Sequence, residues 1–357
     1  MRGLAVLAAL TAAALLSAPT AAAKPRDFVG IVAEDVFWES PSYREQSFAV
    51  QRQLGVQVVR QTFDWSRIET APGQYDFSEY DSFVAHAARH GIRIVPVLFR
   101  PPAFRARGVH TDRKTYPPKT FAHMGHFGAA IAERYGRGGS LWNELPSGSA
   151  KRPITSYQVW NEPNFPVYWP GGPNAKQYVK LLKKTGKAIK SVDRRAKILT
   201  GGLPDSKSGG AVRLFKYIRQ LYKAGGKRHF DVLSINTYAK NPRQLAKLLR
   251  KVRKLMNKRR DRKAKIWASE FGWATQGPDS RFTVGAKKQA RHIGGSIKKM
   301  GKLRRKLKLA GFVYWNWKDA PPYRVGFDFW GLHAGLVQQD GAPKPALAAF
   351  AKAVKKL

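Results

Sequence analysis

The chain has 357 residues and a formal net charge of +42, because 65 Lys and Arg residues stand against 23 Asp and Glu. Its 43% hydrophobic and 12% aromatic residues exclude a disordered chain, which lacks the apolar residues that a core needs. The absence of cysteine excludes a disulfide scaffold and any thiolate metal or redox site.

Residues 1–23 have the features of a signal peptide. Arg2 supplies a positive charge, Leu4–Leu16 is apolar, and small residues precede a mature N-terminus expected near Lys24. A membrane anchor is the alternative, but an apolar run of about 13 residues is shorter than the roughly 20 that span a bilayer. We therefore expect a secreted, extracellular or cell-wall-associated protein whose mature chain has no membrane span.

Short β-rich runs then alternate with amphipathic helical runs. The predicted strands are Phe28–Val32, Val56–Arg60, Ile92–Leu98, Ser156–Trp160, Lys197–Thr200, Asp231–Ile235, Lys265–Ser269 and Gly311–Trp315. The predicted helices are Ser42–Leu54, Ser78–His90 with Ser78 as N-cap, Phe121–Tyr135, Ala175–Val192, Val212–Tyr222, two within Arg243–Lys265 and Lys287–Lys308, and Pro345–Val354. This alternation predicts an α/β fold, a single-domain (β/α)8 TIM barrel. A doubly wound open sheet is the alternative, but no glycine-rich phosphate loop follows the first strand.

Basic residues are concentrated in three stretches, Lys176–Lys197, Arg243–Lys265 and Lys287–Lys308. In the last two, apolar residues recur at helical spacing, so the cations occupy the opposite face of each helix. That face is either an ordinary solvated surface or one that attaches electrostatically to anionic cell-envelope polymers or a polyanionic substrate. Nucleic acid is not an expected partner, because no exposed aromatics or known binding motif accompany the cations.

In a TIM barrel the active residues lie at the C-terminal ends of the strands. Glu162 follows the fourth predicted strand and Glu270 follows the seventh, each beside aromatic residues. Two carboxyl groups across one barrel mouth suit chemistry in which one holds a proton and the other stays ionised. Aromatic surroundings raise the pKa of one carboxyl, and nearby hydrogen-bond donors lower that of the other. The alternative is that each glutamate forms a structural ion pair with one of the abundant cations.

The residues around both glutamates resemble glycoside hydrolase clan A, and within it families 39 and 5. The resemblance is carried by Trp160-Asn161-Glu162-Pro163, by Ser269-Glu270-Phe271-Gly272, and by the segments 60–77, 91–94 and 335–345. It implies that residues 24–357 form a secreted retaining β-glycosidase acting on a β-linked poly- or oligosaccharide. It further implies that Glu162 is the general acid/base, that Glu270 is the nucleophile, and that no cofactor or metal takes part.

The same resemblance assigns four neighbouring side chains. Asn161 would hydrogen-bond the 2-hydroxyl of the sugar, and Arg60, ending the second predicted strand, would keep Glu270 ionised. Tyr238 would donate a hydrogen bond to Glu270, and Trp315 would form the apolar floor beneath the reacting sugar.

Other candidates depart from that pattern or have an open alternative. Asn236 stands where many clan members have His, and an amide can keep the hydrogen-bonding role. Trp38 and Trp273 lie near predicted loop ends and are predicted to bind substrate by stacking on sugar rings, with packing at the rim or in the core as the alternative. Trp330, also near a loop end, either lines the site or packs in the core.

Some motifs are assigned to the surface. Trp142-Asn143-Glu144-Leu145 resembles the acid/base motif but follows a glycine-rich run with no strand, so we assign Glu144 to a surface insertion. His123 and His126 lack the carboxylate spacing of a metal site and are expected to be ordinary helix residues. Two alternatives to hydrolysis remain: a cationic envelope glycan-binding barrel with little or no turnover, and a transglycosylase.

Overall fold

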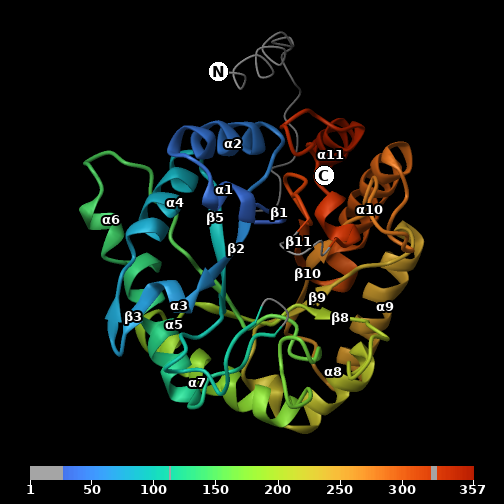
Figure 1. Cartoon of the computed structure of the whole chain (residues 1–357). Helices are drawn as coiled ribbons and strands as arrows, with labels where there is room; N and C mark the ends of the chain where they lie inside the picture. The colour runs from blue at the N-terminus through green and yellow to red at the C-terminus, as the bar shows by residue number, and fades with distance from the viewer. Residues whose placement is uncertain (1–26, 112–113, 323–327) are drawn as a thin grey trace.

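The computed structural model describes residues 27–111, 114–322 and 328–357, so the predicted signal peptide lies outside the described residues. The helices form a ring around a closed set of strands (Figure 1). Within the described ranges, no helix has the length and apolar character that crossing a bilayer requires.

Eight strands form the barrel, and every pairing between neighbours is parallel. They are β1 (Val29–Val32), β2 (Val58–Asp64), β5 (Arg93–Phe99), β6 (Ser156–Val159), β7 (Lys197–Thr200), β9 (Val232–Asn236), β10 (Lys265–Phe271) and β11 (Leu309–Tyr314). The order β10-β11-β1-β2-β5-β6-β7-β9 closes on itself because β10 also pairs with β9. The predicted (β/α)8 barrel is confirmed, with each strand displaced from its expected bounds by no more than a few residues.

The outer helices occur where the apolar periodicity predicted them. They are α2 (Pro41–Gln53), α4 (Ser78–Arg89), α5 (Phe121–Tyr135), α7 (Ala175–Val192), α8 (Leu214–Lys223), α9 (Pro242–Lys258), α10 (Ala286–Leu307) and α11 (Pro345–Lys355). Ser78 is not the N-cap of α4 as predicted. It is the first helical residue, and its N–H donates to the carboxylate of Asp76.

Shorter elements, which the sequence did not predict, decorate the loops. They are α1 (Glu34–Trp38), α3 (Trp65–Ile68), β3 (Glu69–Ala71), β4 (Gln74–Tyr75), α6 (Leu141–Glu144), β8 (Leu203–Pro204), η2 (Gly226–Arg228) and η4 (Trp330–His333). Most of them follow the C-terminal ends of barrel strands, so they build up the rim of the barrel mouth.

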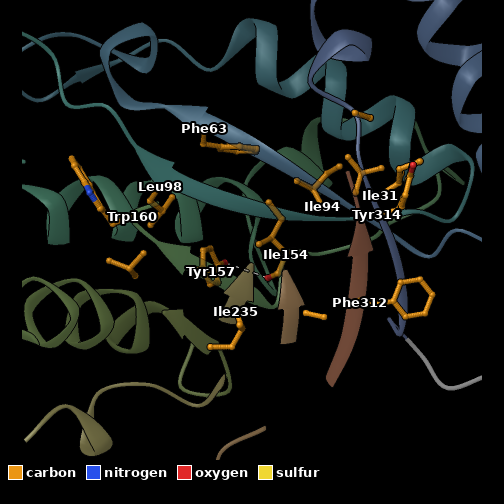
Figure 2. Close-up of a cluster of buried hydrophobic side chains, with 14 of the residues drawn as sticks. Ile31, Phe63, Ile94, Leu98, Ile154, Tyr157, Trp160, Ile235, Phe312 and Tyr314 are labelled. Carbon is orange, nitrogen blue, oxygen red and sulfur yellow. Dashed lines mark hydrogen bonds between the residues drawn. The ribbon is translucent and has the colours of Figure 1, made fainter. Parts of the chain in front are cut away.

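The outward faces of the strands pack under the helices. Figure 2 shows part of this layer, including Ile31, Ile94, Leu98 and Tyr157, all of which are buried. The helices bury the complementary stripe, and α5 presents Met124, Phe127 and Ile131 to the barrel. Burial of this apolar area is the main favourable term available to a chain without disulfides.

The barrel interior changes character along its length. The part further from the mouth is filled by apolar side chains, namely Val32, Val58, Val95, Leu199, Val232, Trp267 and Val313. Two residues further along, β2 places Arg60 inside, β9 places Ser234 and Asn236, and β10 places Ser269. The C-terminal part of the barrel therefore holds a buried polar layer, directly beneath the mouth.

Candidate active site

Glu162 reaches the mouth through a sharp turn after β6. Trp160 and Glu162 have φ angles of 72° and 42°, in the left-handed region that non-glycine residues rarely adopt. The turn is fixed because the indole N–H of Trp160 donates to the carbonyl of Tyr168 at 2.8 Å and its backbone N–H donates to Leu98. Such backbone strain persists only where surrounding contacts enforce it, and it is concentrated at functional sites.

Glu270 reaches the same place through a bulge in β10. The register of β10 shifts between Ala268 and Glu270 against β9, and again against β11. A bulge breaks the alternation of a strand and re-aims a side chain. Consequently Ser269 donates to Asn236 at the end of β9, and Glu270 accepts from Tyr238, two residues beyond that strand.

Glu270 is held between a cation and a phenol. Its Oε1 lies 3.0 Å from Nη1 of Arg60, with both side chains almost fully buried, and its Oε2 accepts from the hydroxyl of Tyr238 at 2.6 Å. Arg60 also donates to Oε1 of Gln158 and to Oδ1 of Asn161, each at 3.0 Å. Both oxygens of Glu270 are therefore engaged, one by a buried cation and the other by a hydroxyl donor.

Arg60 does not end its strand as predicted, because β2 continues to Asp64. What places it at the site is its inward orientation and its position in the polar layer. The predicted contacts of Arg60 and Tyr238 with Glu270 are both present in the structure.

Glu162 has a different environment. Its Oε1 accepts from Nδ2 of Asn236 at 2.6 Å, and the hydroxyl of Ser269 donates to Oδ1 of that amide at 2.8 Å, which orients it. Desolvation and the negative charge of Glu270 raise the pKa of Glu162 to about 8, against the opposing effects of Asn236 and Arg60. Glu162 is therefore protonated at neutral pH while Glu270 is paired with Arg60.

A third carboxyl group, which the sequence analysis missed, lies beside this network. Glu34, at the start of α1, accepts from the amide of Gln61 at 2.6 Å and from the backbone and hydroxyl of Thr62 at 2.9 and 2.7 Å. Desolvation raises the pKa of Glu34, and the charge of Arg60 opposes that rise. The sequence pattern that could have identified Glu34 is its position two residues after the first strand, at the C-terminal end of the barrel.

Partly exposed aromatic rings stand beside Tyr238. The ring of Trp330 in η4 lies 4.9 Å from that of Tyr238, and Phe282, in the loop after β10, lies 4.6 Å from Trp330. Trp315 directly follows β11 and is half-buried, with its indole N–H donating to Gly331 at 3.0 Å. Phe282 was not predicted, because it comes from a loop with no local pattern.

The two other predicted tryptophans, Trp38 and Trp273, differ in their exposure to solvent. Trp38 is 62% exposed at the end of α1, with the guanidinium of Arg67 4.6 Å from its ring centre. Trp273 is fully buried, donates to the carbonyl of Ala239 at 2.9 Å, and packs against His292 of α10. The prediction that Trp273 binds substrate is wrong, because its ring lies outside the barrel beneath a helix.

The assignment of Glu144 to the surface is confirmed. Glu144 lies in α6, is exposed, and pairs with Arg134, so it is not part of the mouth. His123 lies 3.2 Å from Nη1 of Arg105. Across the described ranges, no three or more His, Asp or Glu side chains are arranged to hold a metal ion.

A family model and several solved structures that are similar to this chain belong to glycoside hydrolases. The family model Glyco_hydro_42, described as beta-galactosidase, matches residues 37–102. A family 39 glycoside hydrolase from Bacteroides cellulosilyticus WH2 superposes with a TM-score of 0.68 at 19% identity, over 92% of this chain and 63% of that one. The chain therefore spans less than two thirds of that enzyme's length. No curated protein matches the sequence.

Other solved structures cover more of their own length. A GH39 beta-xylosidase from Caulobacter crescentus gives a TM-score of 0.65 at 18% identity, over 91% of this chain and 70% of that one. Xylanase 10B from Thermotoga maritima gives 0.60 at 13% identity, over 93% and 95%. The barrel of this chain thus has the fold of the glycoside hydrolases that its strand-end motifs resemble.

Proposed function

We propose that the chain is a secreted retaining β-glycosidase that hydrolyses a β-linked poly- or oligosaccharide by double displacement. The observation that carries the proposal is the pair of strand-end glutamates, which lie in one network but in different environments. Glu270 is paired with Arg60, and the pKa of Glu162 is raised to about 8. This is the arrangement that a nucleophile and a general acid require at neutral pH.

In the first step, a carboxylate oxygen of Glu270 bonds to the anomeric carbon as the bond from that carbon to the leaving oxygen breaks. The proton of Glu162 passes to the leaving oxygen. In the second step, the carboxylate of Glu162 takes a proton from water, the water oxygen bonds to the anomeric carbon, and the ester bond to Glu270 breaks.

The electrostatics support this alternation. The charge of Glu270 is one of the causes that raise the pKa of Glu162. Once Glu270 is an ester that charge is gone, so the pKa of Glu162 falls and its carboxylate becomes available as a base. The group that donates a proton in the first step is thereby prepared to accept one in the second.

The neighbouring side chains have matching roles. Arg60 bridges Glu270 and Asn161, which positions the Asn161 amide for the 2-hydroxyl of the reacting sugar. Trp315 offers a half-buried ring as the floor of the site. Export rests on the signal-peptide features of residues 1–23. Transfer of the glycosyl group to a sugar acceptor would use the same two glutamates.

The test uses the mature protein with aryl β-glycosides and a panel of β-glucans, xylans, mannans and galactans. We expect Glu270→Gln to lose at least about 10³-fold in kcat/KM. Glu162→Gln should keep the first step with a good leaving group, and azide should restore turnover by forming a β-glycosyl azide. Glu144→Gln is the matched control, because it removes the glutamate of the surface motif and should retain wild-type rates.

Two results would contradict the proposal. One is near wild-type turnover in either active-site variant. The other is a product of inverted anomeric configuration when the first-formed sugar is followed by NMR. A barrel that binds glycans without turnover would bind members of the panel and release no product from any of them.

A further inference from the structure

One half of the outer helix ring has a single sign of charge. The helices α7 to α11 follow one another around the ring, from the bottom of the view along its right side to the top (Figure 1). Together they contain 27 Lys and Arg residues, 20 of them Lys, and no Asp or Glu. Most of these cations are exposed. We call this surface the cationic half-ring.

The other half of the ring is built differently. Its helices α2, α4 and α5 carry both signs, and their charges pair, as in Arg89 with Glu45 and Arg134 with Asp81. Within the described ranges, Lys190 is the one cation of the half-ring helices with an ion-pair partner, Asp231 at 2.9 Å.

This asymmetry exceeds what solvation of a helix face requires. A solvated helix normally mixes both signs, because opposite charges three or four residues apart stabilise it and like charges destabilise it. On α7, the exposed Lys180, Lys183, Lys184 and Lys187 are all like-charged neighbours at this spacing. Among the described residues, these lysines have no ion-pair partner, so their repulsion favours binding of a counter-charge from outside these helices.

The shape and composition of the half-ring define that partner. Its outer side is convex, so a stiff duplex or a flat lipid surface would touch only a narrow line of it, whereas a flexible chain can follow it. Lys predominates over Arg, which suits diffuse attraction more than bidentate recognition. Of the large apolar side chains that are exposed among the described residues, only Val192 lies on these helices, so none of the exposed ones offers a ring on which a base could stack.

We propose that the cationic half-ring is a docking surface for a flexible linear polyanion, namely an acidic polysaccharide that carries carboxylates. Binding replaces the counterions of both partners and removes the repulsion among the lysines. The choice of a polysaccharide over another flexible polyanion rests on the proposed glycosidase function. The existence and place of the docking surface do not.

The test measures binding of polygalacturonate to the mature Glu270→Gln protein, in which hydrolysis cannot obscure binding. Onto it are added Lys247→Glu, Lys251→Glu, Lys298→Glu and Lys302→Glu, four exposed residues on the adjacent helices α9 and α10. The matched control has the same net charge and carries Arg52→Glu, Lys119→Glu, Lys151→Glu and Arg152→Glu, all exposed and outside the half-ring. Circular dichroism confirms that both are folded.

We expect the dissociation constant to rise steeply with salt, and the half-ring variant to bind at least about tenfold more weakly than its control. Equal weakening in both variants would overturn the proposal, because net charge and not the surface would then be responsible. Tighter binding to single-stranded DNA, to a polyol phosphate or to phosphatidylglycerol vesicles than to polygalacturonate would overturn the choice of partner. In a wild-type background, both sets of substitutions should leave hydrolysis of a small aryl glycoside unchanged, so loss of docking and failure of the proposed catalysis are distinguishable.

Discussion

Glu162 should make the protein less stable as the pH rises, and Glu162→Gln should remove that loss. The pKa of Glu162 is about 8 in the folded protein against an ordinary value of 4.5. Between these two pH values the folded state binds a proton that the unfolded state has released. The free energy of unfolding therefore falls as the pH rises through this interval, and the loss is complete only above pH 8.

The two pKa values correspond to at most about 5 kcal/mol. The carboxyl group is partly open to solvent at the barrel mouth, so we expect a smaller effect of about 2 kcal/mol. Glu162→Gln keeps the acceptor oxygen that faces Asn236 but cannot titrate. It should match the wild type in stability near pH 4 and exceed it increasingly up to pH 9.

Urea unfolding at intervals from pH 4 to pH 9 measures this difference directly. Glu144→Gln is the control, because Glu144 is exposed, its pKa is lowered by Arg134, and it is ionised throughout the upper part of the range. A stability difference between Glu162→Gln and wild type that stays constant from pH 5 to pH 9 would refute the reasoning. It would mean that Glu162 does not hold its proton at neutral pH.

Three further predictions concern other parts of the structure. Asn236→Ala removes a hydrogen bond that lowers the pKa of Glu162, so the alkaline limb of the pH profile of kcat/KM should move to higher pH. An alkaline limb at the same pH as in the wild type would contradict this. Lys344→Met leaves Asp319, 2.5 Å away and nearly fully buried, without its cation, which should cost about 3 to 5 kcal/mol in urea unfolding, and Asp319→Asn should recover part of it. Trp330→Ala should raise KM for oligosaccharides more than it lowers kcat, because its partly exposed ring lies beside Tyr238 and has no part in the proposed proton transfers. Equal KM values for variant and wild type would remove Trp330 from the substrate site.

The regular elements could be predicted from the sequence because their periodicity is strong. The bounds of α5 and α7 agree with the predicted Phe121–Tyr135 and Ala175–Val192, since each helix has one continuous apolar stripe. The strands, which are buried on both sides, are short apolar runs between polar loops and could also be found. The rim elements are only two to five residues long and have no period to detect.

The site could be predicted in part. The two glutamates stand out because each leaves an apolar strand at the end where barrel chemistry occurs. Trp273 was misassigned because a bulge cannot be seen in the sequence: once the bulge turns Glu270 inward, Phe271 and Trp273 face the surrounding helices. Phe282 and Trp330 meet only in the folded chain, from loops far apart in the sequence.

The distribution of charge around the helix ring would also determine how the molecule is oriented on an anionic layer. The half-ring lies on the side of the barrel (Figure 1), whereas Glu162 and Glu270 lie at the C-terminal ends of β6 and β10, at one end of the barrel axis. A molecule bound through the half-ring has its barrel axis parallel to the layer. Its mouth then opens in a direction parallel to the layer. Strands running within the same layer would then meet the mouth directly, and strands projecting outward would not.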